Sequence, residues 1–157
     1  MIGGYMKKRY LLLGGIIFLM LTGCGNTSME AKSLSDFENA GNNNSYVVTD
    51  NKENYKNSDY IVEASLASYN DISIEMIVYD TSDNASLVQE EQIKNFNLLK
   101  STGASEKRDK GNNYYKYVLI SNNYYMISSR IDNTLIFCKT PLSNKDKVEN
   151  LINEMGY

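Results

Sequence analysis

The stretch from Tyr124 to Lys139, YYMISSRIDNTLIFCK, carries the clearest structural signal in the chain. Its central dipeptide, Asp132-Asn133, separates two runs that are rich in β-branched and aromatic residues. Both residues of the dipeptide tolerate the positive φ values that a two-residue hairpin turn requires. The turn fixes the register, so that Ile131 pairs with Thr134. The stretch therefore predicts an antiparallel β-hairpin.

This register divides the hairpin side chains between two faces of a sheet. One face carries small and branched residues that suit contact with helices: Tyr125, Ile127, Ser129, Ile131, Ile136 and Cys138. The opposite face has an apolar centre and a basic rim, and its candidate binding residues are Tyr124, Met126, Arg130, Leu135, Phe137 and Lys139. A helix-free face normally alternates toward polar residues, so this one predicts a contact surface for a protein partner or an apolar ligand. The other interpretation is that loops or neighbouring side chains cover it.

Hydrophobic periodicity predicts the elements on either side of the hairpin. Strands are expected over residues 46–49, 60–69, 74–79, 114–120, 124–131 and 134–139. Helices are expected from Leu34 to a stop at Gly41, over 84–100 and over 144–155, with Ser33 and Ser143 as N-caps. The charged stretch 101–113 is expected to be a loop.

Read in order, these elements are a helix, three strands, a helix, three strands and a helix. The pattern predicts an α+β fold, with about three helices on one face of an antiparallel sheet of about six strands. The order also indicates a two-fold pseudo-repeat of one helix with three strands. The alternative is that such units recur in α+β folds without duplication.

The beginning of the chain has the layout of a secretory leader. A basic stretch, Lys7 to Arg9, precedes the apolar run Tyr10–Leu21 and the small residues Thr22 and Gly23. The run is too short to cross about 30 Å of hydrocarbon. The sequence LTGC, which ends at Cys24, resembles the lipobox of bacterial lipoproteins. That resemblance implies cleavage before Cys24, a lipid on its sulfur and residence on the outer face of the cell membrane. The alternative is a secretory leader without lipid, because small residues precede the cleavage site in both classes.

Cleavage at this point predicts three parts: a leader over 1–23, Cys24 with a short polar tether to residue 32, and a single domain over 33–157. As a flexible coil, the tether would span about 16 Å. The mature chain keeps 134 of the 157 residues and loses three of the 16 basic ones, which leaves a net charge of −6. This charge argues against nucleic acid as a partner and against a polybasic grip on lipid headgroups. The lipid is therefore the expected membrane attachment.

The complete absence of histidine limits the available chemistry. It excludes Ser-His-Asp catalysis, Cys-His catalysis and histidine-ligated zinc.

Cys138 lies in an apolar run and is expected to be a buried thiol. No metal or other cofactor is expected, because the stretch Asp80 to Glu91 lacks the glycine of a calcium loop and reads instead as a capped helix start.

The mature domain is loosely similar to small uncharacterised lipoproteins of Gram-positive bacteria, and this likeness implies no activity. We expect a non-enzymatic binding or interaction module. Two alternatives stay open: a carboxylate-based hydrolase of cell-wall polymers, and an accessory or inhibitory subunit of a neighbouring membrane protein. Asp and Glu are plentiful, but no motif places two of them at the separation that hydrolysis needs.

Overall fold

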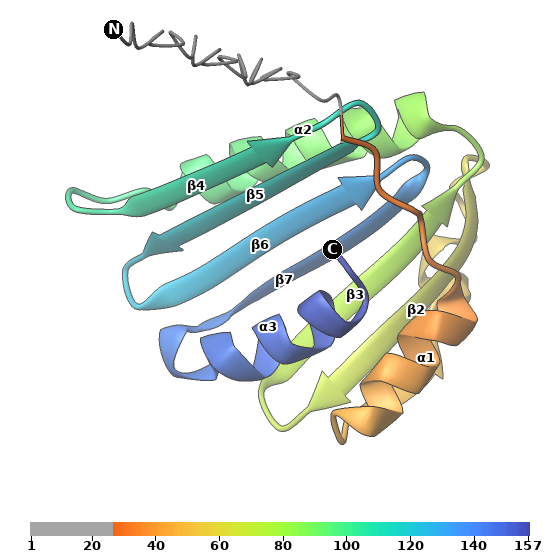
Figure 1. Cartoon of the computed structure of the whole chain (residues 1–157), viewed down its shortest axis with the longest axis horizontal. Helices are drawn as coiled ribbons and strands as arrows, with labels where there is room; N and C mark the ends of the chain where they lie inside the picture. The colour runs from red at the N-terminus through yellow and green to blue at the C-terminus, as the bar shows by residue number, and fades with distance from the viewer. Residues whose placement is uncertain (1–26) are drawn as a thin grey trace, which may run out of the picture.

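The computed structural model describes residues 27–157, so Cys24 and the leader lie outside the described residues. One antiparallel sheet forms the centre, in the spatial order β1-β2-β3-β7-β6-β5-β4 (Figure 1). Its strands are β1 (Val47–Asp50), β2 (Ile61–Tyr69), β3 (Ile72–Tyr79), β4 (Ser105–Lys110), β5 (Tyr114–Ser121), β6 (Tyr124–Ile131) and β7 (Thr134–Pro141). The helices are α1 (Leu34–Asn43), α2 (Ser82–Asn97) and α3 (Lys145–Glu154), with short 3₁₀ turns η1 (Lys52–Tyr55) and η2 (Leu142–Asn144). The predicted α+β class is confirmed, with seven strands in place of about six.

The helices lie on both faces of the sheet, so their predicted placement on one face is wrong. Phe37 of α1 and Leu151 of α3 are fully buried in the same cluster as Ile127 and Ile136. We name this side the α1/α3 face. Helix α2 covers the opposite side, the α2 face, where its Ile93 and Phe96 join a separate buried cluster. The sheet is therefore the middle layer of three, as Figure 1 shows.

The central hairpin has the predicted register. Ile131 pairs with Thr134, and Asp132 in the turn has a φ of 48°. Ile127 pairs with Cys138, whose side chain is 1% exposed. Burial raises the pKa of this thiol to about 12, so Cys138 packs as a small apolar residue.

Strand β4 lies within the stretch that was expected to be a loop. Its sequence, SEKRDK, has no apolar alternation, and most of its residues are exposed. It is an edge strand that pairs with β5 alone. Charged side chains at an exposed edge discourage pairing with other chains, which explains why this strand lacks the usual apolar signal.

The ends of the helices differ in detail from the prediction. The capping box of Ser33 with Asp36 is present. Gly41, however, lies inside α1, where a Cβ atom would meet Val48 Cγ2 at 2.3 Å, so it permits close packing rather than ending the helix. Thr81 caps α2 through the backbone N–H of Asn84. Helix α3 continues directly from η2 and has no side-chain cap, so Ser143 does not cap it.

The pseudo-repeat holds for the strands but not for the helices. Strands β3 and β7 are antiparallel neighbours, and β1-β2-β3 mirrors β5-β6-β7 in spatial order. Two antiparallel strands are exchanged by a two-fold axis only when that axis is perpendicular to the sheet. Rotation about such an axis does not exchange the two faces of the sheet, so two helices related by it would share one face. In the structure, α1 and α2 lie on opposite faces. The fold therefore lacks the two-fold symmetry that the order of elements indicates.

Residues 27–32, which we name the arm, were expected to be a flexible tether. In the structure the arm is held against the turn between β4 and β5, and it runs along the end of the sheet to α1 (Figure 1). The arm is therefore in contact with the domain through Met29 and Asn113. Within residues 27–157, no helix is long and apolar enough to cross a bilayer.

Candidate functional site

The predicted binding face is largely closed by α2. Met126 and Leu135 are fully buried beneath this helix. Arg130 is half-buried: its Nε donates to Gln89 of α2, and its Nη1 donates to the backbone oxygen of Asp132. The prediction that these three residues form an open contact surface is wrong, because α2 supplies the apolar cover that the face requires.

Gln89 is the residue that the sequence interpretation missed on this side. Its side chain is 1% exposed, and its Nε2 donates to the backbone oxygens of Tyr115 at 2.8 Å and Ser128 at 3.3 Å. These bonds join α2 to the neighbouring strands β5 and β6. A clear apolar periodicity would have predicted that α2 packs on this face. A polar residue such as Gln89 on the inner side of the helix weakens that periodicity.

Three predicted face residues remain at least partly accessible. Tyr124 is 42% exposed, Phe137 is half-buried, and Lys139 is exposed with its ammonium 5.1 Å from the centre of the Tyr124 ring. Together they form a strip on β6 and β7. No cavity among those identified in the described residues is lined by this strip, so it offers contact area without a pocket.

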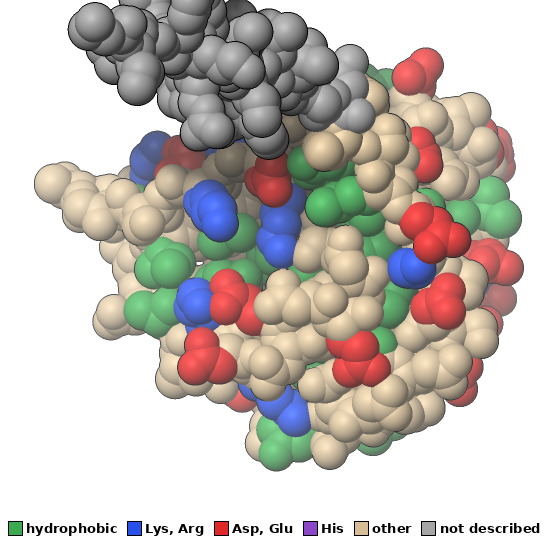
Figure 2. Space-filling view, in the orientation of Figure 1, with side chains coloured by type: hydrophobic (Ala, Val, Ile, Leu, Met, Phe, Trp, Pro, Cys, Tyr) green, Lys and Arg blue, Asp and Glu red, His purple; other side chains and the backbone are tan. Residues whose placement is uncertain are grey.

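A hollow lies on the α1/α3 face, between α3 and strands β4 and β5. We name it the trough. Its volume is about 350 Å³, and its apolar floor consists of Val118 and Ile120 from β5. The polar lining consists of Ser105, Lys107, Asp109, Lys116, Lys145, Glu149 and Asn153. Figure 2, which views this face, has lysine side chains in blue beside green apolar ones in this region.

Lys116 is a half-buried charge that lines the trough. Its side chain rises from β5, and its Nζ donates to the backbone oxygen of Tyr157 at 2.6 Å. Burial lowers the pKa of this ammonium, because the charged form loses part of its hydration. The ammonium of Lys116 is partly desolvated and donates here to one oxygen, so it retains donor capacity for an anionic ligand.

The two carboxylates of the trough are already engaged. Glu149 accepts from Tyr125 Oη at 3.2 Å and from Lys145 Nζ at 2.5 Å, each on a different oxygen. Asp109 accepts from Tyr114 Oη at 3.2 Å. The trough therefore brings Asp109 and Glu149 to one hollow, although neither was singled out in the sequence. With both oxygens occupied, Glu149 is positioned to hold its neighbours rather than to donate a proton.

The residue types of the trough define what it can bind. Three lysines against two carboxylates leave an excess of one positive charge, next to the aliphatic floor. Such a lining suits a small ligand with a carboxylate or phosphate group beside an apolar portion. The alternating positions Lys107 and Asp109 on β4 belonged to the stretch expected to be a loop, so the sequence could not place them on one face.

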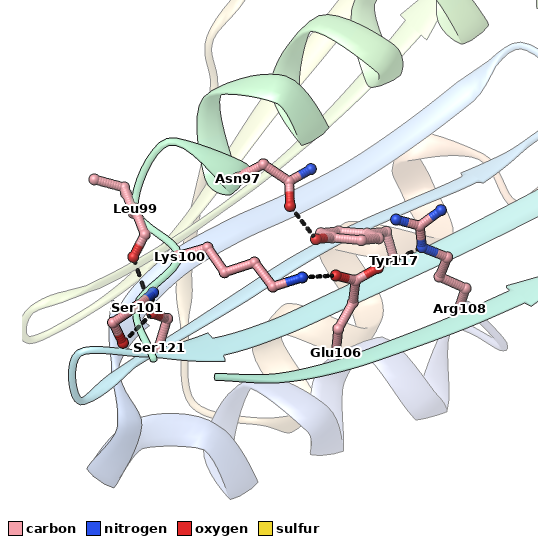
Figure 3. A network of polar contacts seen from close by, with 8 residues as sticks. All are labelled: Asn97, Leu99, Lys100, Ser101, Glu106, Arg108, Tyr117 and Ser121. Atoms are coloured by element: carbon pink, nitrogen blue, oxygen red, sulfur yellow. Dashed lines mark hydrogen bonds and ion pairs between the residues drawn. The ribbon is translucent and has the colours of Figure 1, made fainter. Parts of the chain in front are cut away.

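A second polar network lies across β4, on the α2 face, and has a different role. Glu106 bonds to Lys100 Nζ and to Arg108 Nε, both at 2.5 Å, and these donors lower the pKa of its carboxyl (Figure 3). Tyr117 Oη donates to Asn97 Oδ1 at 2.9 Å, beneath the Arg108 guanidinium. The network attaches edge strand β4 to the end of α2, and its charges are already paired.

Within residues 27–157, no group of three or more His, Cys, Asp or Glu side chains is arranged to hold a metal ion. No family model and no curated protein matches the chain. Among solved structures, the crystal structure of a GTP binding regulator from Thermotoga maritima is similar with a TM-score of 0.43 and 14% identity. The match covers 80% of this chain and 89% of the other.

Proposed function

We propose that this chain is a membrane-anchored extracytoplasmic lipoprotein that acts as a non-enzymatic binding module, with the trough as its binding site. The sequence that ends at Cys24 supports the anchor, through its resemblance to the lipobox. The geometry of the trough supports binding. One observation carries this proposal: the ammonium of Lys116 is partly buried and lies above the aliphatic floor of the trough.

The supported ligand class is a small molecule with a carboxylate or phosphate group. Lys116 and Lys107 supply positive charge to the trough, while Val118 and Ile120 supply apolar area. The backbone oxygen of Tyr157 is the present partner of Lys116, and a bound anion would form a stronger, charge-assisted hydrogen bond with it.

The test compares ligand-induced stabilisation in two lysine variants. A series of small carboxylates, phosphates, amines and neutral analogues is added to the mature protein, and the melting temperature is measured. We expect anions with an apolar portion to raise it saturably, because a ligand that binds only the folded state stabilises that state. Lys116→Met should remove the increase. Lys94→Met is the matched control, since Lys94 is an exposed residue of α2 and its loss changes the charge equally.

Two outcomes would contradict the proposed site. One is an equal increase in the wild type and in Lys116→Met, which would place anion binding elsewhere. The other is that every class of compound leaves the melting temperature of the wild type unchanged.

The alternative of a carboxylate-based hydrolase gains one supporting observation, since Asp109 and Glu149 share the trough. Hydrolysis requires one carboxyl group that donates a proton and a second that activates water or attacks. Both oxygens of Glu149 already accept hydrogen bonds, which favours binding over catalysis. Turnover of wall fragments that is lost in both Asp109→Asn and Glu149→Gln would favour the hydrolase instead.

A further inference from the structure

The arm is attached to the turn between β4 and β5 by a pair of hydrogen bonds from one side chain. Asn113 Oδ1 accepts from the backbone N–H of Met29 at 2.9 Å, and Asn113 Nδ2 donates to the backbone oxygen of Met29 at 2.7 Å. The side-chain amide of Asn113 thus bonds to both the N–H and the C=O of Met29, as the backbone of a neighbouring β-strand would. Asn113 Nδ2 also lies 2.9 Å from Asp132 Oδ2, which fixes the amide orientation.

The beginning of the arm fits closely against the same turn. The backbone oxygen of Thr27 accepts from the backbone N–H of Asn112 at 3.1 Å. Gly111 makes this approach possible, because a Cβ at this position would lie 2.4 Å from the Thr27 oxygen. At the other end of the arm, the backbone N–H of Lys32 donates to Tyr157 Oη at 3.4 Å. The arm is thus held along its length before α1 begins.

The attachment leaves little chain between the fold and Cys24. Three residue steps separate Cys24 from Thr27, and a fully extended chain covers at most about 3.6 Å per residue, or about 11 Å here. A flexible tether from Cys24 to residue 32 would let the domain turn freely. With Thr27 attached, the turn between β4 and β5 is the part of the sheet closest to the anchor.

We propose that the arm orients the domain on the lipid surface, with the β4–β5 turn next to the bilayer and the opposite end of the sheet, near Thr102, directed away from it. This inference rests on the proposed lipid at Cys24. The chemistry of the turn agrees with such a position, because residues 111–115, GNNYY, carry no charge that anionic headgroups would repel.

The proposed orientation also determines where the trough lies relative to the bilayer. Tyr114 Oη contacts Thr27 Oγ1 at 3.3 Å and donates to Asp109 Oδ1 at 3.2 Å. One hydroxyl therefore links the arm to the lining of the trough, at the end that holds Asp109 and Lys116. A ligand bound there would lie close to the headgroups.

The test uses the absence of tryptophan from the chain. Two single-tryptophan variants of the full chain are made, Lys110→Trp beside the turn and Thr102→Trp at the other end of β4, both at exposed positions. The six residues of β4 separate the two ends of this strand by about 20 Å. The lipidated proteins are reconstituted in vesicles that contain a nitroxide-headgroup phospholipid, and quenching of tryptophan fluorescence is measured.

We expect several-fold stronger quenching at position 110 than at position 102. A second pair of variants carries an insertion of about 12 Gly and Ser residues between Asn26 and Thr27, which spans about 19 Å as a flexible coil. The insertion keeps the arm contacts and should bring the two quenching values together. Asn113→Ala should do the same by releasing the arm, whereas Asn95→Ala, at an exposed position of α2, should leave the difference unchanged.

Equal or reversed quenching in the uninserted pair would overturn the inference. So would a difference that survives the insertion, because another surface would then set the orientation. The mass of the N-terminal peptide separates this result from the proposed lipid anchor. If that mass carries no lipid, the proposed anchor fails, and the same variants are tested with Cys24 coupled to a maleimide phospholipid, since buried Cys138 does not compete.

Discussion

Met126 and Ile127 are consecutive residues of β6, are both fully buried, and point to opposite faces of the sheet. Met126 packs in a cluster with Ile93 and Phe96 of α2, and Ile127 packs in a cluster with residues of α1 and α3. A strand with one open face cannot bury two neighbours in this way. The pair therefore defines the sheet as a middle layer.

Truncation of either residue is expected to be costly. Met126→Ala and Ile127→Ala should each lower the free energy of unfolding by about 2 to 5 kcal/mol, through lost burial and a residual cavity. Leu87→Ala, on the outer side of α2 where the side chain is 63% exposed, should change it by less than about 0.5 kcal/mol. Denaturant melts measure all three values. A small loss for Met126→Ala would mean that α2 does not cover this face.

Gln89→Ala tests the polar connection beneath α2. The Gln89 amide donates to two backbone oxygens and accepts from Arg130 Nε at 3.3 Å, while its side chain is almost fully buried. Its removal leaves the Arg130 contact without an acceptor and should cost about 1 to 3 kcal/mol in a denaturant melt. Glu90→Ala, at the next and exposed position of α2, serves as the control. Equal effects of the two substitutions would contradict the assigned role of Gln89.

The Glu106 network predicts a pH dependence of stability. Hydrogen bonds from Lys100 and Arg108 lower the pKa of Glu106 from its ordinary value of 4.5. The ionised form is therefore favoured by folding, and its contribution is present above pH 4.5 and is lost as the pH falls through the lowered pKa. The stability difference between the wild type and Glu106→Gln should thus be largest near neutral pH and shrink in acid. A difference that grows as the pH falls would contradict this sign.

Local signals were sufficient for most of the strands. The hairpin around Asp132 was predictable in register, because two residues that tolerate positive φ interrupt two β-rich runs. The turn at Asn70 follows the same chemistry, with a φ of 50°. Alternation within each run then assigned Ile127 and Cys138 to a buried face, and both are buried.

The placement of α2 required information that local patterns do not contain. Some strands are buried on both faces and others on one face only. Their sequences differ only at the positions that point to the second face. Here that face includes Ser128 and Arg130, as an exposed face would. The face on which a helix packs is set by the connection between elements, and the inner residues of α2 include Gln89, which blurs its apolar stripe.

The candidate site was the least predictable part of the molecule. Tyr124, Phe137 and Lys139 were placed on one face and do share it, but the trough lies on the other side of the sheet. Its residues come from β4, β5 and α3, and β4 has no apolar periodicity. Only the tertiary structure brings Lys107 and Lys116 to the same hollow as Glu149.

We propose that lipid on Cys24 holds the mature protein at the membrane, and the mass of the N-terminal peptide shows whether that lipid is present. The protein is isolated from the membrane fraction of its host, digested with protease and measured by mass spectrometry. We expect a peptide that begins at Cys24 and carries a diacylglyceryl group, and we expect Cys24→Ala to move the protein out of the membrane fraction. A wild-type peptide that begins at Cys24 with a free thiol, or that retains the leader, would rule out a lipid anchor at Cys24.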